Sequence, residues 1–178
     1  MTESKGRIIF VIGGARSGKS SFALCRAAAL PGKKVYIATA QAFDAEMTER
    51  INHHKEERCG DWDTVEEPVR MADAFRSASS GYDIILIDCL TLWLSNLLCG
   101  NIDAEKEFEA FLASLLSADR SQHIYIVSNE VGQGIVPDNA LARRFRDLAG
   151  HLNRKVAGIA DEVYLVTAGI PLKIKPSA

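Results

Sequence analysis

Short apolar runs alternate with longer amphipathic stretches along most of the chain. Five of the runs have the length and the β-branched residues typical of buried strands. They cover residues 7–12, 35–39, 83–88, 123–127 and 162–167, and a weaker extended segment is expected at 62–66. Because helical patterns separate most of these strands, we expect a mainly parallel sheet with helices on both faces.

Apolar spacings of three and four residues predict the helices between the strands. The expected helices cover residues 21–29, 44–58, 68–80, 89–98, 103–118 and 138–159. Pro68 is expected in the first turn of its helix, and Asp138 is expected to cap the last one. The apolar stripe of that last helix is expected to be Leu141, Phe145, Leu148, Leu152 and Val156. A tight turn at 169–171 then predicts a final antiparallel edge strand, 172–174.

Length and composition fit one folded domain. The 178 residues are expected to form a single domain, with residues 1–6 as a flexible N-terminal extension. A net charge of -2 argues against a nucleic-acid partner. The cysteines at positions 25, 59, 89 and 99 lack metal-ligand spacing, so we expect free thiols in a cytoplasmic protein. We expect no signal peptide and no membrane span.

The first strand leads directly into a glycine-rich loop. The loop is Gly13-Gly14-Ala15-Arg16-Ser17-Gly18-Lys19-Ser20, which matches G-x-x-x-x-G-K-[ST] at every fixed position. In such loops backbone N–H groups point at phosphate oxygens beside a helix N-terminus. Lys19 would contact the β- and γ-phosphates, and the Ser20 hydroxyl would bind Mg²⁺. The flanking strand and helix favour a phosphate loop over a chance turn, so ATP or GTP is the expected ligand.

Asp88 ends the apolar strand 83–88 and has two interpretations. In a phosphate-loop fold a carboxylate at this place can reach Mg²⁺ or the nucleotide. Alternatively, the aspartate caps the helix that starts at Cys89. A switch GTPase is not indicated, because the strand is followed by Cys89-Leu90-Thr91 rather than by Asp-x-x-Gly.

Two adjacent histidines lie on the expected helix 44–58. At 100° per residue, His54 shares a side with Met47 and Ile51, whereas His53 points nearly the opposite way. A neutral imidazole is a competent nucleophile toward phosphorus. On spacing alone, His54 is therefore either a nucleophile or a packing residue on an apolar helix face.

Three other groups also have a functional and a structural interpretation. Thr39-Ala40-Gln41 follows the second strand, where open α/β sheets bind ligands, but an ordinary loop fits equally. The arginines of the last helix clamp phosphates or form a solvated face; they are Arg143, Arg144 and Arg146. Trp93 stacks on a flat substrate or packs in the core.

Seven short stretches match one family pattern. They are residues 13–20, Tyr36-Ile37-Ala38-Thr39-Ala40-Gln41, Arg50-Ile51-Asn52-His53-His54-Lys55, Asp88-Cys89-Leu90-Thr91, residues 128–137 with Asn129-Glu130-Val131-Gly132, Arg144-Phe145-Arg146-Asp147-Leu148-Ala149-Gly150 and Ala160-Asp161-Glu162-Val163. Together they resemble, along nearly the whole chain, the bifunctional adenosylcobinamide kinase / adenosylcobinamide-phosphate guanylyltransferase family of cobalamin biosynthesis. The phosphate loop alone would be generic, but its combination with the paired histidines and the Asn-Glu-Val-Gly loop is specific.

The resemblance implies a RecA-like phosphate-loop NTPase fold and two reactions at one nucleotide site. The kinase reaction phosphorylates the aminopropanol hydroxyl of adenosylcobinamide, and the transferase reaction attaches GMP from GTP to that phosphate through a guanylylated histidine. This histidine aligns with His54, the residue that the helical pattern also turns inward, with His53 as the alternative. A phosphate-loop kinase without a covalent step and a nucleotide-dependent regulator are the competing function classes.

The resemblance also implies further site residues and partners. The walls of the guanylate pocket would be Thr39, Ala40, Gln41, Lys55, Glu56, Glu57 and Arg58. Glu66 and Asp88 resemble the acidic nucleotide contacts of the family. Mg²⁺, a corrinoid substrate and a homo-oligomer, a trimer, are implied as well.

Overall fold

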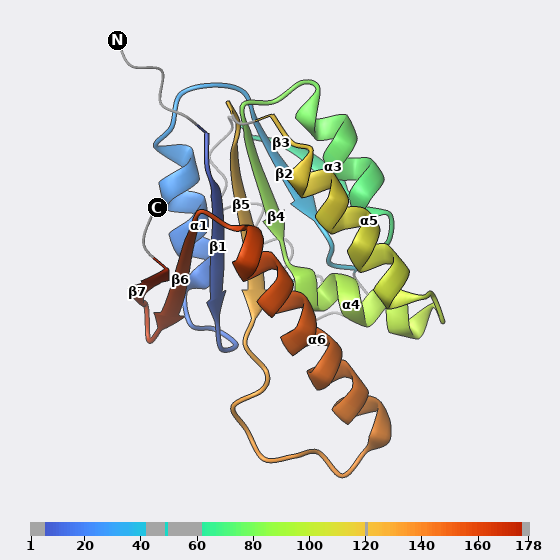
Figure 1. Cartoon of the computed structure of the whole chain (residues 1–178). Helices are drawn as coiled ribbons and strands as arrows, with labels where there is room; N and C mark the ends of the chain where they lie inside the picture. Colours follow the sequence, from blue (N-terminus) through green and yellow to red (C-terminus); the bar gives the residue numbers. More distant parts are fainter. Residues whose placement is uncertain (1–5, 42–48, 50–61, 120, 176–178) are drawn as a thin grey trace.

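The computed structural model describes residues 6–41, 49, 62–119 and 121–175. Seven strands form one sheet in the order β3-β2-β4-β5-β1-β6-β7 (Figure 1). Their bounds are β1 Ile8–Gly13, β2 Lys34–Ala38, β3 Trp62–Glu66, β4 Ile84–Asp88, β5 His123–Asn129, β6 Glu162–Thr167 and β7 Ile170–Lys175. Only β7 pairs antiparallel, with β6; the other pairings are parallel. The expected mainly parallel sheet with an antiparallel edge strand is confirmed.

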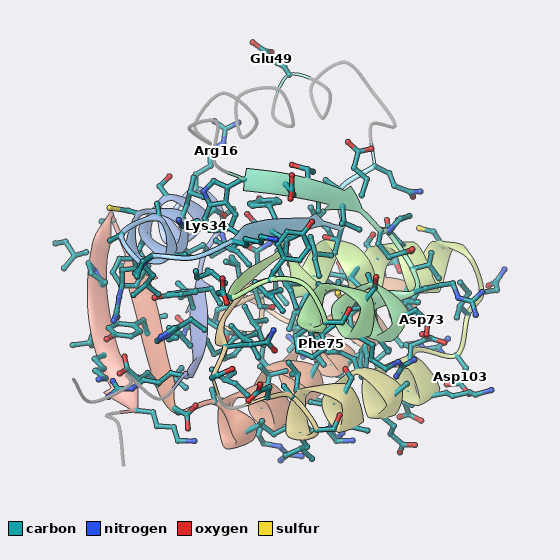
Figure 2. The ribbon with its side chains drawn as sticks, turned by 90° about the horizontal axis from the view of Figure 1, so that it is seen from above. Arg16, Lys34, Glu49, Asp73, Phe75 and Asp103 are labelled. Atoms are coloured by element: carbon teal, nitrogen blue, oxygen red, sulfur yellow. The ribbon has the colours of Figure 1, made fainter. Side chains whose placement is uncertain are left out.

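Helices cover both faces of the sheet, as expected. They are α1 Lys19–Ala28, α3 Met71–Ser79, α4 Leu90–Cys99, α5 Ala104–Leu116 and α6 Ala140–Ile159. Apolar side chains of α1 pack on one face, against alternate residues of β1, β4 and β5. Those of α3, α4, α5 and α6 form the larger core on the other face, to which Phe75 contributes (Figure 2). Trp93 belongs to this core: it is fully buried, and its indole N–H donates to the carbonyl oxygen of Val69 at 2.7 Å.

Helix α3 begins three residues later than the pattern predicted. It starts at Met71, and Pro68 lies before it rather than in its first turn. The Glu67 carboxylate accepts hydrogen bonds from the backbone N–H groups of Val69 at 2.9 Å and Arg70 at 2.8 Å. These bonds hold the preceding residues in a turn, which delays the helix.

The cap of α6 is Asn139 rather than Asp138. The Asn139 side-chain oxygen accepts from the N–H groups of Leu141 at 2.7 Å and Ala142 at 3.2 Å. The predicted apolar stripe is buried only toward the far end of the helix, because the N-terminal half of α6 extends past the sheet (Figure 1). Leu141 is therefore 59% exposed, although the pattern predicted it on the core face.

A buried ion-pair cluster holds the amino end of the sheet together. Glu162, 2% exposed, lies 2.6 Å from Arg7, 3.2 Å from Lys173 and 3.6 Å from Arg26. These partners come from the segment before β1, from β7 and from α1, so one carboxylate links three elements. Burial, followed by the charge of Arg7, lowers the pKa of His123 at the start of β5.

The start of the described chain is less exposed than the sequence suggested. Gly6, expected in a flexible extension, is buried, and a Cβ built on it would lie 2.1 Å from the carbonyl oxygen of Gln122. Residues 1–5 of that expected extension lie outside the described residues. In the described part of the chain, every helix is too short or too polar to cross a membrane.

Candidate nucleotide site at the carboxyl edge of the sheet

The glycine-rich loop joins the end of β1 to the start of α1, as the motif requires. Gly18 caps α1 with a φ of 89°, and Arg16 also has a positive φ, 55°. Lys19 is the first residue of the helix; its side chain is 93% buried and its Nζ donates to the Gly14 carbonyl at 3.0 Å. Ser20 follows on the first helical turn, half-buried. The loop therefore curls around the lysine that it is expected to present to phosphates.

Two glycines of the loop are required by close backbone approach. A Cβ on Gly13 would lie 2.4 Å from the Val166 carbonyl oxygen of β6 and 2.6 Å from the Ser17 hydroxyl. A Cβ on Gly18 would lie 3.3 Å from the Gly169 Cα, and its positive φ disfavours a side chain as well. Gly14 differs, because nothing lies within 4 Å of a Cβ built there.

The β6–β7 turn supports the loop from one side. The Gly169 N–H donates to the Ser17 carbonyl at 2.9 Å. Ala168 and Gly169 have positive φ values of 50° and 79°, which form the tight turn between the strands. The sequence predicts this turn but gives no indication that it lies against the phosphate loop.

Asp88 ends β4 at the same edge of the sheet. Strand β5 separates β4 from β1, so two strand spacings of nearly 5 Å each put this carboxylate about 10 Å from the end of β1. Its Oδ2 accepts a hydrogen bond of 2.8 Å from the Tyr36 hydroxyl on β2. The cap of α4 is Cys89, and the helix begins at Leu90. Asp88 therefore does not cap α4, and the helix-cap interpretation is wrong. Its carboxylate lies at the carboxyl edge of the sheet, hydrogen-bonded to Tyr36.

Cys89 connects Asp88 with the phosphate loop electrostatically. Burial and then the charge of Asp88 raise the pKa of the Cys89 thiol, and the Lys19 ammonium opposes this rise. Both charged groups therefore act on the same buried thiol. The carboxyl edge of the sheet thus carries the Ser20 hydroxyl, the Lys19 ammonium and the Asp88 carboxylate. These are the groups that bind a nucleotide with Mg²⁺.

Thr39, the residue after β2, is hydrogen-bonded to Cys89, the residue after β4. It is fully buried; its hydroxyl accepts from the Cys89 N–H at 2.8 Å and donates to the Cys89 carbonyl at 2.9 Å. The Thr39 side chain thus fixes the residue after Asp88. Ala40 and Gln41 follow, half-buried, beyond the end of β2.

The other acidic residue predicted at the site is Glu66. Glu66 ends β3, is exposed, and lies level with Ala38 and, one strand further, Asp88. The acidic positions therefore share the carboxyl edge. The remaining predicted residues, His53, His54, Lys55, Glu56, Glu57 and Arg58, lie outside the described residues.

Sequence reasoning missed the polar end of β5, which lies between the phosphate loop and Asp88. Asn129 pairs in register with Gly13, and its side-chain N–H donates to the Thr91 hydroxyl at 2.9 Å. Asn153 of α6 donates to the Asn129 carbonyl at 3.0 Å. Within the described part of the chain, the side-chain oxygens of Ser128, Asn129 and Asn153 are buried without a hydrogen-bond partner. The available signal was a Ser-Asn pair closing an apolar strand.

No cluster of three or more His, Cys, Asp or Glu side chains that would hold a metal ion occurs among the described residues. The donor set instead fits Mg²⁺ shared with a nucleotide, since this ion usually takes one or two protein ligands together with phosphate oxygens and water.

Sheet order, phosphate loop and strand-ending carboxylate define a P-loop nucleoside triphosphatase fold. Solved structures agree: an ATPase of the type III secretion system of pathogenic bacteria has a TM-score of 0.57 at 12% identity, covering 92% of this chain and 51% of that chain. The flagellar accessory protein FlaH from Methanocaldococcus jannaschii has a TM-score of 0.51 at 13% identity, covering 97% of this chain and 80% of that chain. At these identities the likeness shows the fold alone.

The chain belongs to the cobinamide kinase / cobinamide phosphate guanyltransferase family, whose pattern matches residues 9–174. The bifunctional adenosylcobalamin biosynthesis protein CobP of Pseudomonas aeruginosa is 45% identical over 170 residues, covering 93% of this chain and 95% of the relative. The corresponding protein CobU of Escherichia coli is 40% identical over 184 residues, covering 94% of this chain and 99% of the relative. The resemblance expected from the seven motifs is confirmed.

Proposed function

We propose that this protein phosphorylates the aminopropanol hydroxyl of adenosylcobinamide and then transfers GMP from GTP to adenosylcobinamide phosphate. The observation that carries the proposal is the phosphate loop closing on Lys19 at the sheet edge where β4 ends in Asp88, in a chain of this family. The names of its relatives, which describe bifunctional proteins of adenosylcobalamin biosynthesis, support two activities rather than one.

In the kinase step the acceptor hydroxyl oxygen attacks the γ-phosphorus of the nucleotide. The bond from that phosphorus to the β–γ bridging oxygen breaks, a nucleoside diphosphate leaves, and the hydroxyl proton is released. Lys19 and the N–H groups of the loop would neutralise charge on the phosphates. Ser20 and Asp88 would hold Mg²⁺, which adds charge neutralisation when bound.

In the transfer step a histidine nitrogen of His54 attacks the α-phosphorus of GTP. The bond to the α–β bridging oxygen breaks and pyrophosphate leaves. A phosphate oxygen of adenosylcobinamide phosphate then attacks the same phosphorus and breaks the phosphorus–nitrogen bond, giving adenosylcobinamide-GDP. The inward side predicted for His54 and the family pattern support this role; Gln41, at the start of the segment leading to His54, lies at the same edge as the phosphate loop.

The test is a labelling experiment without corrinoid. The protein is incubated with Mg²⁺ and GTP labelled at the α-phosphate, in the wild type and in His53→Ala and His54→Ala. We expect an acid-labile, alkali-stable adduct that only His54→Ala lacks, and kinase activity that survives in that variant. A folded, GTP-binding wild type without any adduct would instead support the alternative, a small-molecule kinase with no covalent step.

The assembly state is a separate part of the proposal. The family resemblance supports a homotrimer. Light scattering coupled to size-exclusion chromatography measures the mass directly, and a monomer mass of 19.4 kDa in solution would contradict it.

A further inference from the structure

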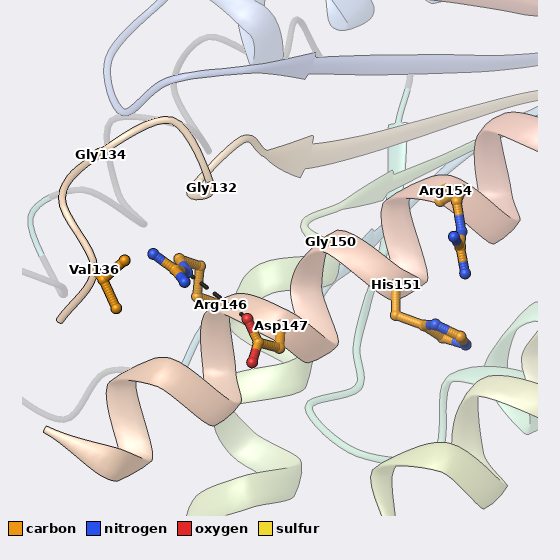
Figure 3. Close-up of a pocket in the computed structure, with 8 residues that line it drawn as sticks. All are labelled: Gly132, Gly134, Val136, Arg146, Asp147, Gly150, His151 and Arg154. Atoms are coloured by element: carbon orange, nitrogen blue, oxygen red, sulfur yellow. Dashed lines mark ion pairs between the residues drawn. The ribbon is translucent and has the colours of Figure 1, made fainter.

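A hollow lies between α6 and the loop that follows β5. Its volume is about 570 Å³. Figure 3 shows the loop on one side and α6 on the other; the lining residues are Gly132, Gly134, Val136, Arg146, Asp147, Gly150, His151 and Arg154. Two of the family motifs extend beyond the nucleotide site: the Asn-Glu-Val-Gly loop, which leaves it after Asn129, and the Arg-Phe-Arg-Asp-Leu-Ala-Gly helix segment. The folded chain places them face to face around this hollow.

The hollow opens next to the nucleotide site. The Glu130 N–H donates to the Gly13 carbonyl at 3.0 Å, so the loop leaves the sheet directly beside the phosphate loop. The Glu130 carboxylate accepts from the Gly132 N–H at 2.7 Å, which fixes the first turn of the loop. Gly132 lines the hollow and lies two residues from Glu130, at most about 7 Å along the chain. A ligand in the hollow is therefore near the reacting phosphates but on the α6 face of the sheet.

The Arg146 guanidinium lines this hollow, and its N–H groups donate no hydrogen bond within the described part of the chain. Its side chain is 21% exposed, yet its only ion pair among the described residues is with Asp147, at 3.8 Å. Asp147 is itself 74% exposed. Figure 3 shows the Arg146 guanidinium turned toward Gly132 and Gly134 of the loop. A guanidinium has five N–H donors in a fork that matches phosphate oxygens, and none of them has a hydrogen bond within the described part of the chain.

The neighbouring arginines behave differently. Arg143 donates to the carbonyl oxygens of Pro137 and Asp138 at 2.9 and 2.6 Å, so it fastens the loop to the helix. Arg144 is exposed and does not line the hollow. The solvated-face interpretation therefore fits Arg144, whereas Arg146 lines the hollow.

We propose that the hollow is the acceptor site and that Arg146 binds the phosphomonoester of the phosphorylated acceptor. This inference rests on the proposed function. The ionisable lining residues are three basic ones, Arg146, His151 and Arg154, and one acidic one, Asp147. Figure 3 shows Arg146 on the loop side of α6 and His151 and Arg154 directed away from the loop, so Arg146 is the cation that an anion between loop and helix would meet. The nucleotide has its own phosphate loop beside α1, so the anion in the hollow is the one that the acceptor carries after the first reaction.

The glycines opposite Arg146 suit the same ligand. Both glycines line the hollow without a side chain. The Gly132 N–H is already donated to Glu130, but a phosphate held by the guanidinium can approach the main chain at Gly134. An unphosphorylated acceptor lacks this anion and gains little from the arginine. Arg146 therefore distinguishes the substrate of the second reaction from that of the first.

The test compares Arg146→Gln with Arg144→Gln, a matched loss of one charge on the same helix. Steady-state kinetics give the KM of adenosylcobinamide phosphate in GMP transfer and the KM of adenosylcobinamide in phosphorylation. Losing a charged hydrogen-bond pair corresponds to roughly a 10- to 100-fold change in affinity. We expect Arg146→Gln to raise the KM of the phosphorylated acceptor by that factor and the KM of the unphosphorylated acceptor by at most about threefold. Arg144→Gln should change neither by more than about twofold.

Arg146→Lys provides a second variant, which keeps the charge but loses the fork and should fall between wild type and Arg146→Gln. Equal rises in both KM values, or no rise for the phosphorylated acceptor, would overturn the proposal. If the wild type transfers GMP and Arg146→Gln does so with unchanged KM, only the acceptor-site proposal fails. If the wild type gives neither adduct nor transfer, the proposed function itself fails, and this proposal with it.

Discussion

Gly13 and Gly14 are adjacent in the phosphate loop, yet the structure predicts opposite consequences when each is replaced by alanine. In Gly13→Ala the new Cβ would lie 2.4 Å from the Val166 carbonyl oxygen, and contacts below 3.0 Å essentially never occur. Because that oxygen belongs to the backbone of β6, the two strands must move apart by at least the difference, 0.6 Å. In Gly14→Ala the Cβ meets nothing within 4 Å.

The magnitude follows from the two costs at Gly13. Overpacking of a dense interior costs roughly 1–3 kcal/mol, and weakening one hydrogen bond between β1 and β6 adds about 1 kcal/mol. We therefore expect Gly13→Ala to lose about 2–4 kcal/mol of unfolding free energy. For a domain of this size that corresponds to a fall in Tm on the order of 10 °C. Gly14→Ala should be neutral or more stable by up to about 1 kcal/mol, because alanine restricts the unfolded chain.

Urea unfolding without nucleotide measures both variants, with the fluorescence of the fully buried Trp93 and far-UV circular dichroism as probes. A second measurement is the rise in Tm on adding GTP, which reports binding to the folded state. We expect this rise to be lost in Gly13→Ala. Equal urea midpoints for the two variants would refute the claim that β6 dictates glycine at position 13.

Three further predictions concern residues outside the phosphate loop. Glu162→Gln should lower the unfolding free energy, measured in urea, by about 2 kcal/mol. This is less than for a fully buried pair, because the partners of Glu162 are one third to one half exposed. A change under about 0.5 kcal/mol would contradict the ion-pair network. Because the folded-state pKa of His123 is depressed below 6.5, its contribution to stability is present above 6.5 and is lost as the pH falls below it. The urea midpoint should therefore fall less between pH 7 and 5.5 in His123→Gln than in the wild type, and equal falls would refute the assignment. Thiol reagents at neutral pH should label the exposed Cys25 and Cys99 and spare Cys89, whose thiol is buried and has a raised pKa. Peptide mapping by mass spectrometry measures the order of labelling, and early labelling of Cys89 would contradict this prediction.

The features that sequence predicts well are those encoded by neighbouring residues. The phosphate loop needs a strand, two glycines and a lysine within a dozen positions, and Asp88 follows directly from the apolar run that it ends. The same holds for the sheet, because strand and helix patterns alternate along the chain. Local signals fail where two of them compete. Pro68 suits a first helical turn, but the nearby Glu67 carboxylate satisfies the backbone N–H groups in a turn instead.

Contacts between distant segments could not be predicted. The hydrogen bond from Tyr36 to Asp88 joins residues 52 positions apart, and that from Asn96 to Thr39 spans 57. Asn96 belongs to none of the seven stretches, and Tyr36, although it begins one of them, is an ordinary strand residue whose partner the sequence does not indicate. The support of the phosphate loop by Gly169 is similar, because it depends on β6 lying next to β1. These residues acquire their roles only from the sheet order.

The position of β5 explains how one nucleotide site could serve two reactions. Its end, Asn129, lies between the phosphate loop and Asp88, with α1 on one face of the sheet and α6 on the other. The nucleotide is expected on the α1 side, where the loop meets its helix, and the proposed acceptor hollow opens on the α6 side. Both would then meet at the carboxyl end of β5. The acceptor enters with a hydroxyl and later carries a phosphate. It need not leave this edge, because only its reacting group and the phosphorus atom that this group attacks differ between the two steps. The buried, unpartnered oxygens of Ser128, Asn129 and Asn153 in the described chain mark this meeting point as the polar part of an otherwise apolar strand end.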